Sequence, residues 1–169
     1  MLDAGVDAVL LTYSRSTLYY GGTTQPSVFI ITLEDYHLFV IRGLHSVLEE
    51  TWLETDKISS GSGYGNAKEW LKNWTIEQGS LGMELDIVPA AQYLKLSALF
   101  SEFKILDISG LILEQRKTKD SQEIEYTKEA CRIVHHGHQR ILEVLREGMT
   151  ELELSSEVED AHRKAGHEG

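Results

Sequence analysis

The sequence is poor in cysteine and in long apolar runs, and each scarcity excludes a class of protein. Cys131 is the only cysteine, so no intramolecular disulfide can form and a reducing cytoplasm is favoured. No apolar run reaches the ~20 residues that a membrane-spanning helix needs. The N-terminus lacks a basic stretch followed by an apolar one, so we expect no secretory signal and a cytoplasmic protein.

Positive charge is also scarce. The chain carries 27 acidic and 16 basic side chains, a formal net charge of −11. A negative surface repels phosphate backbones and anionic lipids, so we expect neither nucleic acid nor a membrane among the partners. The 169 residues suffice for one ordinary domain with its own core, or for one and a half small ones.

Short apolar runs alternate with helical patterns along the first two thirds of the chain. Strands are expected at residues 5–13, 80–86 and 103–109, and a hairpin at 27–42 around Glu34, Asp35 and Tyr36. Helices are expected at 66–78 and 88–100. This alternation predicts an α/β fold with a mixed, largely parallel sheet flanked by helices.

Only helical patterns follow residue 116. Asp120 with Glu123, and Thr150 with Glu153, resemble the capping boxes that begin helices, while Gly148 is expected to end the first helix. An apolar stripe at helical spacing runs along the first helix through Ile124, Thr127, Cys131, Val134, His138, Ile141 and Leu145. We therefore divide the chain into an α/β domain at 1–116 and two helices at 117–169.

Two short motifs could bind a ligand. The stretch "GSGYG" at 61–65 precedes a helix, where backbone N–H groups can bind phosphate, but its spacing matches neither the dinucleotide motif nor the P-loop. His135 and His138 are three apart on a helix and could reach one ion, yet no third ligand is identifiable. A plain connection and a solvated helix face are the favoured interpretations.

Other reactive side chains also have structural interpretations. His167 and Glu168 are adjacent and cannot form the zinc helix whose ligands are four apart. Cys131 lies on the apolar stripe and is expected to be a buried structural thiol. Trp52, Trp70 and Trp74 are expected to be core anchors or an interface patch rather than a ligand platform. Residue chemistry alone therefore shows no active site.

Three stretches together resemble the Xaa-Pro peptidases, meaning aminopeptidase P and prolidase, with the related creatinase. "AGVDAVLLTYSRSTLYYGGTTQPSVFIITLEDYHLFVIRG" resembles the opening strand, Tyr-Tyr segment, Gly-Thr loop and hairpin of that family. "LGMELDIVPAAQYLKL" is similar to its Gly-x-Glu strand and the helix that follows. The third stretch, from "DISGLILEQRKTKDSQEIEYTKEACRIV" to "LREGMTELELSSEVEDAHRKAGHEG", resembles the beginning of its catalytic domain. Thr17 departs from a common Asn, and Asp120-Ser121 from a common Ser-Pro.

The resemblance implies a creatinase-type N-terminal α/β domain followed by the first helices of a truncated pita-bread catalytic domain. In that family two divalent metal ions, often manganese, are held by two Asp, one His and two Glu. All of these lie beyond the position that matches Gly169. We therefore assign no catalytic, cofactor-binding or metal-ligating residue to this chain. Arg116, Lys119, Glu123 and Ile124 match the junction between the two domains and are expected to be structural.

The same resemblance implies a homodimer formed through the N-terminal domain, with the segment 13–26 as the expected functional surface. A peptide substrate is expected only for the whole enzyme, and the fragment alone is expected to be inactive. A stand-alone, non-catalytic binding or dimerisation module is the alternative. A small-ligand α/β protein that uses the Gly61–Gly65 loop is the least favoured interpretation.

Overall fold

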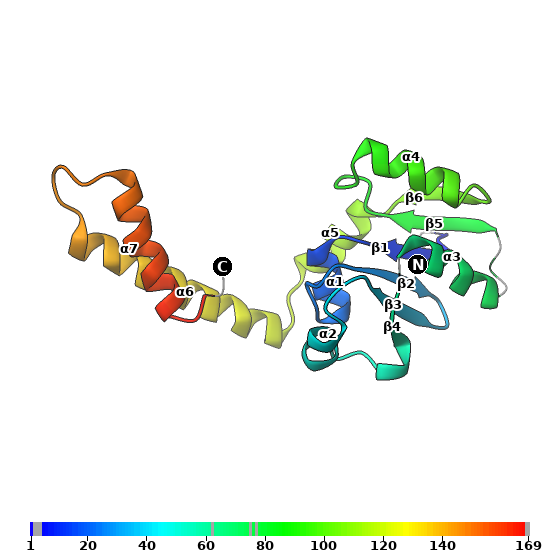
Figure 1. The fold of residues 1–169 in the computed structure, drawn as a ribbon, viewed down its shortest axis with the longest axis horizontal. Coiled ribbons are helices and arrows are strands. Elements are labelled where there is room, and N and C mark those ends of the chain that lie inside the picture. Colours follow the sequence, from blue (N-terminus) through cyan, green and yellow to red (C-terminus); the bar gives the residue numbers. More distant parts are fainter. Residues whose placement is uncertain (2–4, 62, 75, 77, 168–169) are drawn as a thin grey trace. The chain divides into compact units, whose positions relative to one another are not determined.

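A computed structural model describes the chain except for residues 2–4, 62, 75, 77 and 168–169 (Figure 1). The chain forms two compact units, Met1–Glu114 and Gln115–Gly169. Within the described residues, no helix combines the length and the apolar character that crossing a membrane requires.

The first unit is built around a mixed sheet of six strands. The strands are β1 (Ala8–Leu11), β2 (Ser27–Thr32), β3 (Tyr36–Val40), β4 (Ile58–Ser60), β5 (Gly79–Met83) and β6 (Phe103–Asp107). Their spatial order is β4-β3-β2-β1-β5-β6. The β1–β2 and β2–β3 pairs are antiparallel, whereas β1–β5, β3–β4 and β5–β6 are parallel. The predicted mixed sheet and the predicted hairpin are thus confirmed.

Helices cover both faces of the sheet (Figure 1). They are α1 (Ser14–Gly21), α2 (Leu44–Glu50), α3 (Tyr64–Asn73), α4 (Ala90–Leu99) and α5 (Ser109–Lys117), with a 3-10 turn, η2, at Thr55–Lys57. Leu71 of α3 and Leu96 of α4 belong to the core on one face. Val47 of α2 and Ile112 of α5 belong to the core on the other. The predicted arrangement of a sheet flanked by helices is confirmed.

Strand β1 shows why the apolar runs in this sequence are nearly continuous. All four of its residues are buried: Ala8 and Leu10 pack on the α3–α4 side, and Val9 and Leu11 on the opposite side. Successive side chains of a strand point to opposite faces, so a strand covered on both faces needs apolar residues at every position.

Five elements were not predicted: α1, α2, η2, β4 and α5. In α1 the residues Ser14, Ser16 and Thr17 are weak helix formers. Tertiary contacts hold the helix instead, since Ser16 and Thr17 are buried and the Ser16 hydroxyl donates to Glu84 Oε1 at 2.6 Å. The helix predicted at 66–78 starts earlier and ends earlier, at Tyr64–Asn73.

The second unit is a hairpin of α6 (Ser121–Val144) and α7 (Glu151–Lys164). Both predicted capping boxes are confirmed: the side chains of Asp120 and Thr150 accept from the N–H groups of Glu123 and Glu153. The predicted end of the first helix at Gly148 was wrong, because α6 ends at Val144. Gly148 lies in the connection with a φ of +83°.

The helices α6 and α7 pack antiparallel. The contacting face of α6 includes Arg132, Gly137 and Arg140, which do not belong to the predicted apolar stripe. Arg140 Nη2 meets Glu157 Oε2 at 2.6 Å, and Arg132 donates to the carbonyl of Ala165. Gly137, the one residue of α6 that is buried among those described, lies against the ring of His162.

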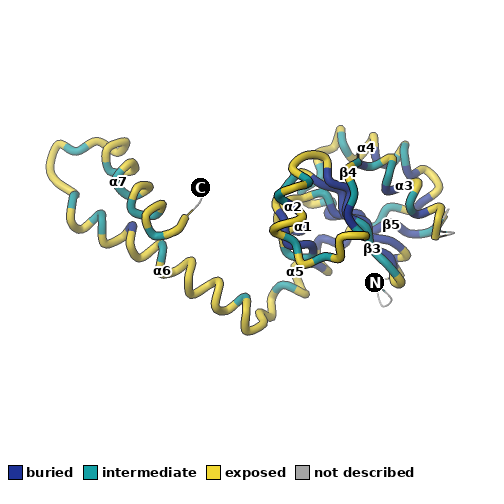
Figure 2. Tube along the Cα trace, turned by 60° about the horizontal axis from the view of Figure 1, so that its bottom comes forward, coloured by how far each residue is buried: buried dark blue, intermediate teal, exposed yellow. Residues whose placement is uncertain are grey.

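The predicted burial of Cys131 was wrong, because its thiol is exposed. Ile124, Val134 and Leu145 of the same stripe are also exposed, and Figure 2 shows most of α6 in the colour of exposed residues. Helical periodicity identifies an apolar face, but it cannot tell which face a neighbouring helix will cover.

Glycine at position 82 is required by close packing on β5. A Cβ atom there would lie 2.8 Å from Ile108 Cγ2 and 3.0 Å from Val6 Cγ1. We expect Gly82→Ala to lower the free energy of unfolding by about 1–2 kcal/mol. The steric cost of the added methyl group exceeds the gain from the lower backbone entropy of alanine in the unfolded chain. Thermal and urea unfolding measure this. Gly110→Ala is the matched control, because no atom lies within 4 Å of a Cβ at that helical position. A neutral Gly82→Ala would contradict the packing argument.

Gly137 and His162 should be energetically coupled. A Cβ at Gly137 would lie 2.0 Å from His162 Nε2, so Gly137→Ala forces the ring or the helix to move. When His162 is replaced by Ala, the same substitution should stabilise α6 by up to about 1 kcal/mol through helix propensity. Hydrogen exchange of the α6 and α7 amides in the four variants of the cycle measures the coupling. Equal effects of Gly137→Ala in both backgrounds would rule out this contact.

Candidate functional site

The carboxyl ends of β1, β5 and β6 are the first place to look for a site, because parallel strands present their ligand-binding crevices there. Glu84 follows β5 and is only 7% exposed, and one of its oxygens accepts from Ser16. Asp107 ends β6 and accepts from the N–H and the hydroxyl of Ser109 and from the N–H of Leu85. The bonds from Ser109 hold the pKa of Asp107 below its usual range. Glu84 thus connects α1 to the end of β5, and Asp107 connects the end of β6 to the residues that follow β5 and β6.

Exposed side chains of the segment 13–26, together with Trp52, form what we call the α1 surface, defined by Tyr13, Leu18 and Trp52. The guanidinium of Arg15 lies 5.0 Å from the Tyr13 ring centroid. Trp52 is 65% exposed and lies against Gly22, where a Cβ would be 2.7 Å from Trp52 Cε3. Gly22 also ends α1 with a φ of +75°, so both the turn and the indole require glycine there.

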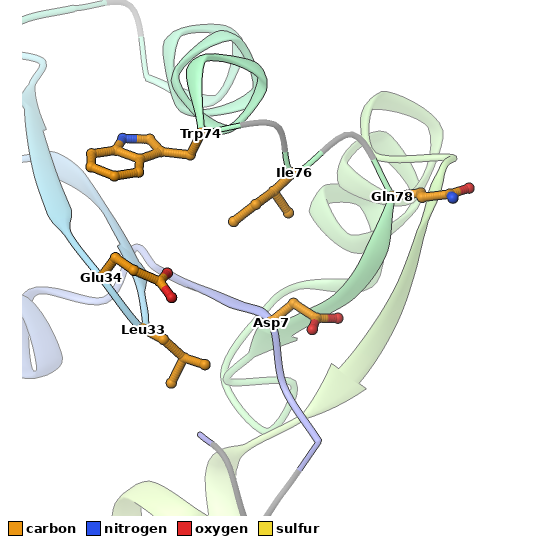
Figure 3. A pocket seen from close by; sticks show the side chains of 6 residues that line it. All are labelled: Asp7, Leu33, Glu34, Trp74, Ile76 and Gln78. Carbon is orange, nitrogen blue, oxygen red and sulfur yellow. The ribbon is translucent and has the colours of Figure 1, made fainter.

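A pocket of about 500 Å³ lies near the amino end of β1 (Figure 3). It is lined by Asp7, Leu33, Glu34, Trp74, Ile76 and Gln78. Asp7 Oδ2 accepts from the N–H and the hydroxyl of Ser80, each at 2.7 Å, and these bonds lower the pKa of Asp7. The Asp7 carboxylate therefore connects the start of β1 to the start of β5 by hydrogen bonds. Glu34 lies below the Trp74 ring in Figure 3, and Gln78 points away from both.

A second pocket, of about 350 Å³, shares Trp74 with the first. Its lining residues are Asp35, His37, Asp56, Lys57, Trp70, Asn73 and Trp74, and we call it the Trp70–Trp74 pocket. Lys57 Nζ lies 2.7 Å from Asp35 Oδ2, and this bond lowers the pKa of Asp35 and raises the pKa of Lys57. His37 Nε2 lies 2.9 Å from the Ser59 hydroxyl, and burial lowers the pKa of His37.

The three tryptophans differ in their environments. Trp70 packs against the core on the α3–α4 side, as expected of an anchor. Trp52 and Trp74, at 65% and 39% exposure, are not core anchors. The sequence did not predict that His37 lies beside Trp70 and Trp74. The spacing of two residues on a helix does not reveal which strand residue packs against them.

Within the described residues, the two motifs that could bind a ligand have structural explanations. Gly63 caps α3 with a φ of +99°, and a Cβ there would be 3.2 Å from Val28, so glycine is needed without any phosphate. Ser62 of the same motif lies outside the described residues. His135, His136 and His138 are exposed, and His136 Nε2 lies 3.1 Å from Arg132 Nη1.

No three His, Cys, Asp or Glu side chains gather to hold a metal ion anywhere in the part of the chain that is described. These residues therefore do not fit the dinuclear centre that the resemblance implies. His167 lies with its ring 6.1 Å from that of His162, while Glu168 is outside the described residues. At the start of α6, Lys119 Nζ donates to the carbonyls of Arg116 and Lys117, and Glu123 completes the cap.

Comparison with known proteins places this geometry in a family. Creatinase from Bacillus sp. is 24% identical over an alignment 165 residues long, which covers 92% of this chain and 40% of that protein. An X-Pro aminopeptidase structure from Thermotoga maritima has a TM-score of 0.83 at 26% identity, with 98% of this chain and 48% of that chain covered. An Xaa-Pro dipeptidase structure from Bacillus anthracis has a TM-score of 0.84 at 26% identity, covering 99% and 47%. The chain thus spans less than half the length of these relatives.

Family matches divide the chain into two consecutive segments. Residues 125–169 match metallopeptidase family M24. Residues 1–118, well over half of the chain, match the creatinase/prolidase N-terminal domain. With its mixed six-stranded sheet and the solved relatives that share it, the chain belongs to the creatinase/prolidase N-terminal domain family.

Proposed function

We propose that this chain supplies the N-terminal domain, residues 1–116, and the first catalytic-domain helices, residues 117–169, of a metal-dependent Xaa-Pro peptidase. The observation that carries the proposal is the order of the two family matches along one chain. The likeness to an X-Pro aminopeptidase and an Xaa-Pro dipeptidase, over 98% and 99% of the chain, supports it. The whole enzyme would act in the cytoplasm on peptides that contain an Xaa-Pro bond.

In this proposal the hydrolytic chemistry belongs to the part of the relatives that the chain does not cover. Two divalent metal ions, manganese in the first instance, would there activate water against the Xaa-Pro bond. Residues 1–169 would supply the framework and the contacts between subunits. The α1 surface supports this role, because Leu18 and Trp52 are exposed apolar side chains on adjacent parts of one domain.

A stand-alone dimerisation module is the second candidate. The same exposed side chains favour it, since they do not depend on a catalytic domain. The two candidates differ in whether a protein that contains this chain hydrolyses peptides with bound metal or only associates with a partner. Hydrolysis and association can be measured separately.

The purified chain should not hydrolyse an Xaa-Pro dipeptide. With Ala-Pro and MnCl2, release of proline should equal that of a blank, because the described residues contain no cluster that fits a metal pair. An intact Xaa-Pro dipeptidase is the positive control, and a chelator-treated sample is the negative one. Turnover that manganese raises, that the chelator abolishes and that elutes with the chain would overturn the assignment of chemistry to the uncovered region.

The chain should dimerise through the α1 surface. We expect Leu18→Glu to weaken dimerisation at least about tenfold, because a carboxylate buried in an apolar interface loses its hydration. Leu94→Glu is the matched control: Leu94 is an exposed leucine on α4, away from the segment 13–26. Sedimentation velocity over a concentration series measures both. A chain that stays monomeric throughout, or equal effects of the two substitutions, would contradict the assigned surface.

A further inference from the structure

The Trp70–Trp74 pocket brings three aromatic rings together, with Trp70 next to each of the other two. The Trp70 and Trp74 centroids are 5.7 Å apart with their planes at 47°, and the His37 centroid lies 6.3 Å from that of Trp70. Trp70 is held from behind by the core, and His37 is held by Phe39, whose ring centroid is 4.5 Å away. Packing thus holds the Trp70 and His37 rings, and these two rings and that of Trp74 line one cavity of about 350 Å³.

The charged groups around these rings leave a negative balance. Lys57 is engaged by Asp35, so the two charges cancel. His37 faces Asp35, Asp56 and Lys57, and burial lowers its pKa and so disfavours its positively charged form. Asp56, an exposed residue of η2, accepts no hydrogen bond from any residue in the described parts of the chain. The charge of Asp56 also raises the pKa of Lys57, so Asp35 and Asp56 share one ammonium and the pocket keeps a net negative charge.

We propose that the Trp70–Trp74 pocket binds an alkylammonium group, with the indole faces as its walls and Asp56 as its counter-charge. Aromatic faces carry negative electrostatic potential, and tryptophan attracts cations most strongly. A cavity of this volume accommodates a small organic cation. An anion would meet both the ring faces and Asp56 unfavourably. A free amine and the side chain of a lysine in a polypeptide present the same chemistry.

The indole N–H resonances of the three tryptophans provide an internal comparison. Choline is the probe, and 3,3-dimethyl-1-butanol is its uncharged isostere. We expect choline to shift the Trp70 and Trp74 resonances saturably, with a dissociation constant on the order of millimolar, and to leave Trp52 unchanged. The butanol should produce no saturable shift. Equal shifts with the two probes, or shifts of all three tryptophans together, would overturn the proposal.

Substitutions identify the groups responsible. Asp56→Asn and Trp74→Leu should each weaken choline binding about two- to fivefold, as expected for one exposed cation contact. Asp86→Asn is the matched control and should have no effect, because Asp86 is an exposed aspartate that does not line the pocket. Asp56 is exposed, so Asp56→Asn is expected to fold normally. Unchanged affinity in Asp56→Asn, with the fold verified by circular dichroism, would contradict the role of that carboxylate.

A second titration distinguishes the sources of the ammonium group. Nα-acetyl-lysine amide carries the lysine side chain without a free amino terminus. Tighter binding of this probe than of choline would assign the pocket to a polypeptide partner, and tighter binding of choline would assign it to a free amine. Binding of neither probe would overturn the proposal.

Discussion

The pairing of β1 with β5 is the constraint on which the first unit depends. It joins the antiparallel half of the sheet, β2 and β3, to the parallel half, β5 and β6. The ladder itself is short, since only Ala8 with Leu81 and Val9 with Gly82 are in register. Polar clamps extend it at both ends: Asp7 binds Ser80 before the ladder, and Ser16 binds Glu84 after it.

This constraint explains the chemistry of the strand ends. The carboxyl edge of a parallel sheet is where many α/β proteins bind ligands, but here its acids serve the chain itself. Glu84 is buried and bonded to α1, and Asp107 orders the turn that leads into α5. The bonds from Ser109 lower the pKa of Asp107, and hydrogen bonds to an ionised carboxylate are stronger than bonds between neutral groups. The two places to which we assign binding by proposal lie elsewhere, over α1 and around Trp74.

Sequence patterns predicted those parts of the fold whose cause is local. The buried strands were visible because both faces of the sheet are covered, and the two capping boxes because four residues suffice to form each. Elements held by distant contacts, such as α1 with its buried Ser16, were invisible. The Trp70–Trp74 pocket could not be predicted either, because Asp35, Asp56 and Trp70 come from separate elements that no common period links.

The helical hairpin has a different energetic basis from the sheet. Among its described residues only Gly137 is buried in α6, and none is buried in α7. Capping boxes and exposed ion pairs each contribute about 1 kcal/mol or less, and a hairpin of two helices is marginal without apolar burial. Ile124, Val134 and Leu145 hold the apolar area that remains available for burial. Under the proposed function, the rest of the catalytic domain would cover these side chains. On that proposal the exposed stripe on α6 would be one face of a larger apolar core, and its exposure would not reflect a weakness of the helix itself.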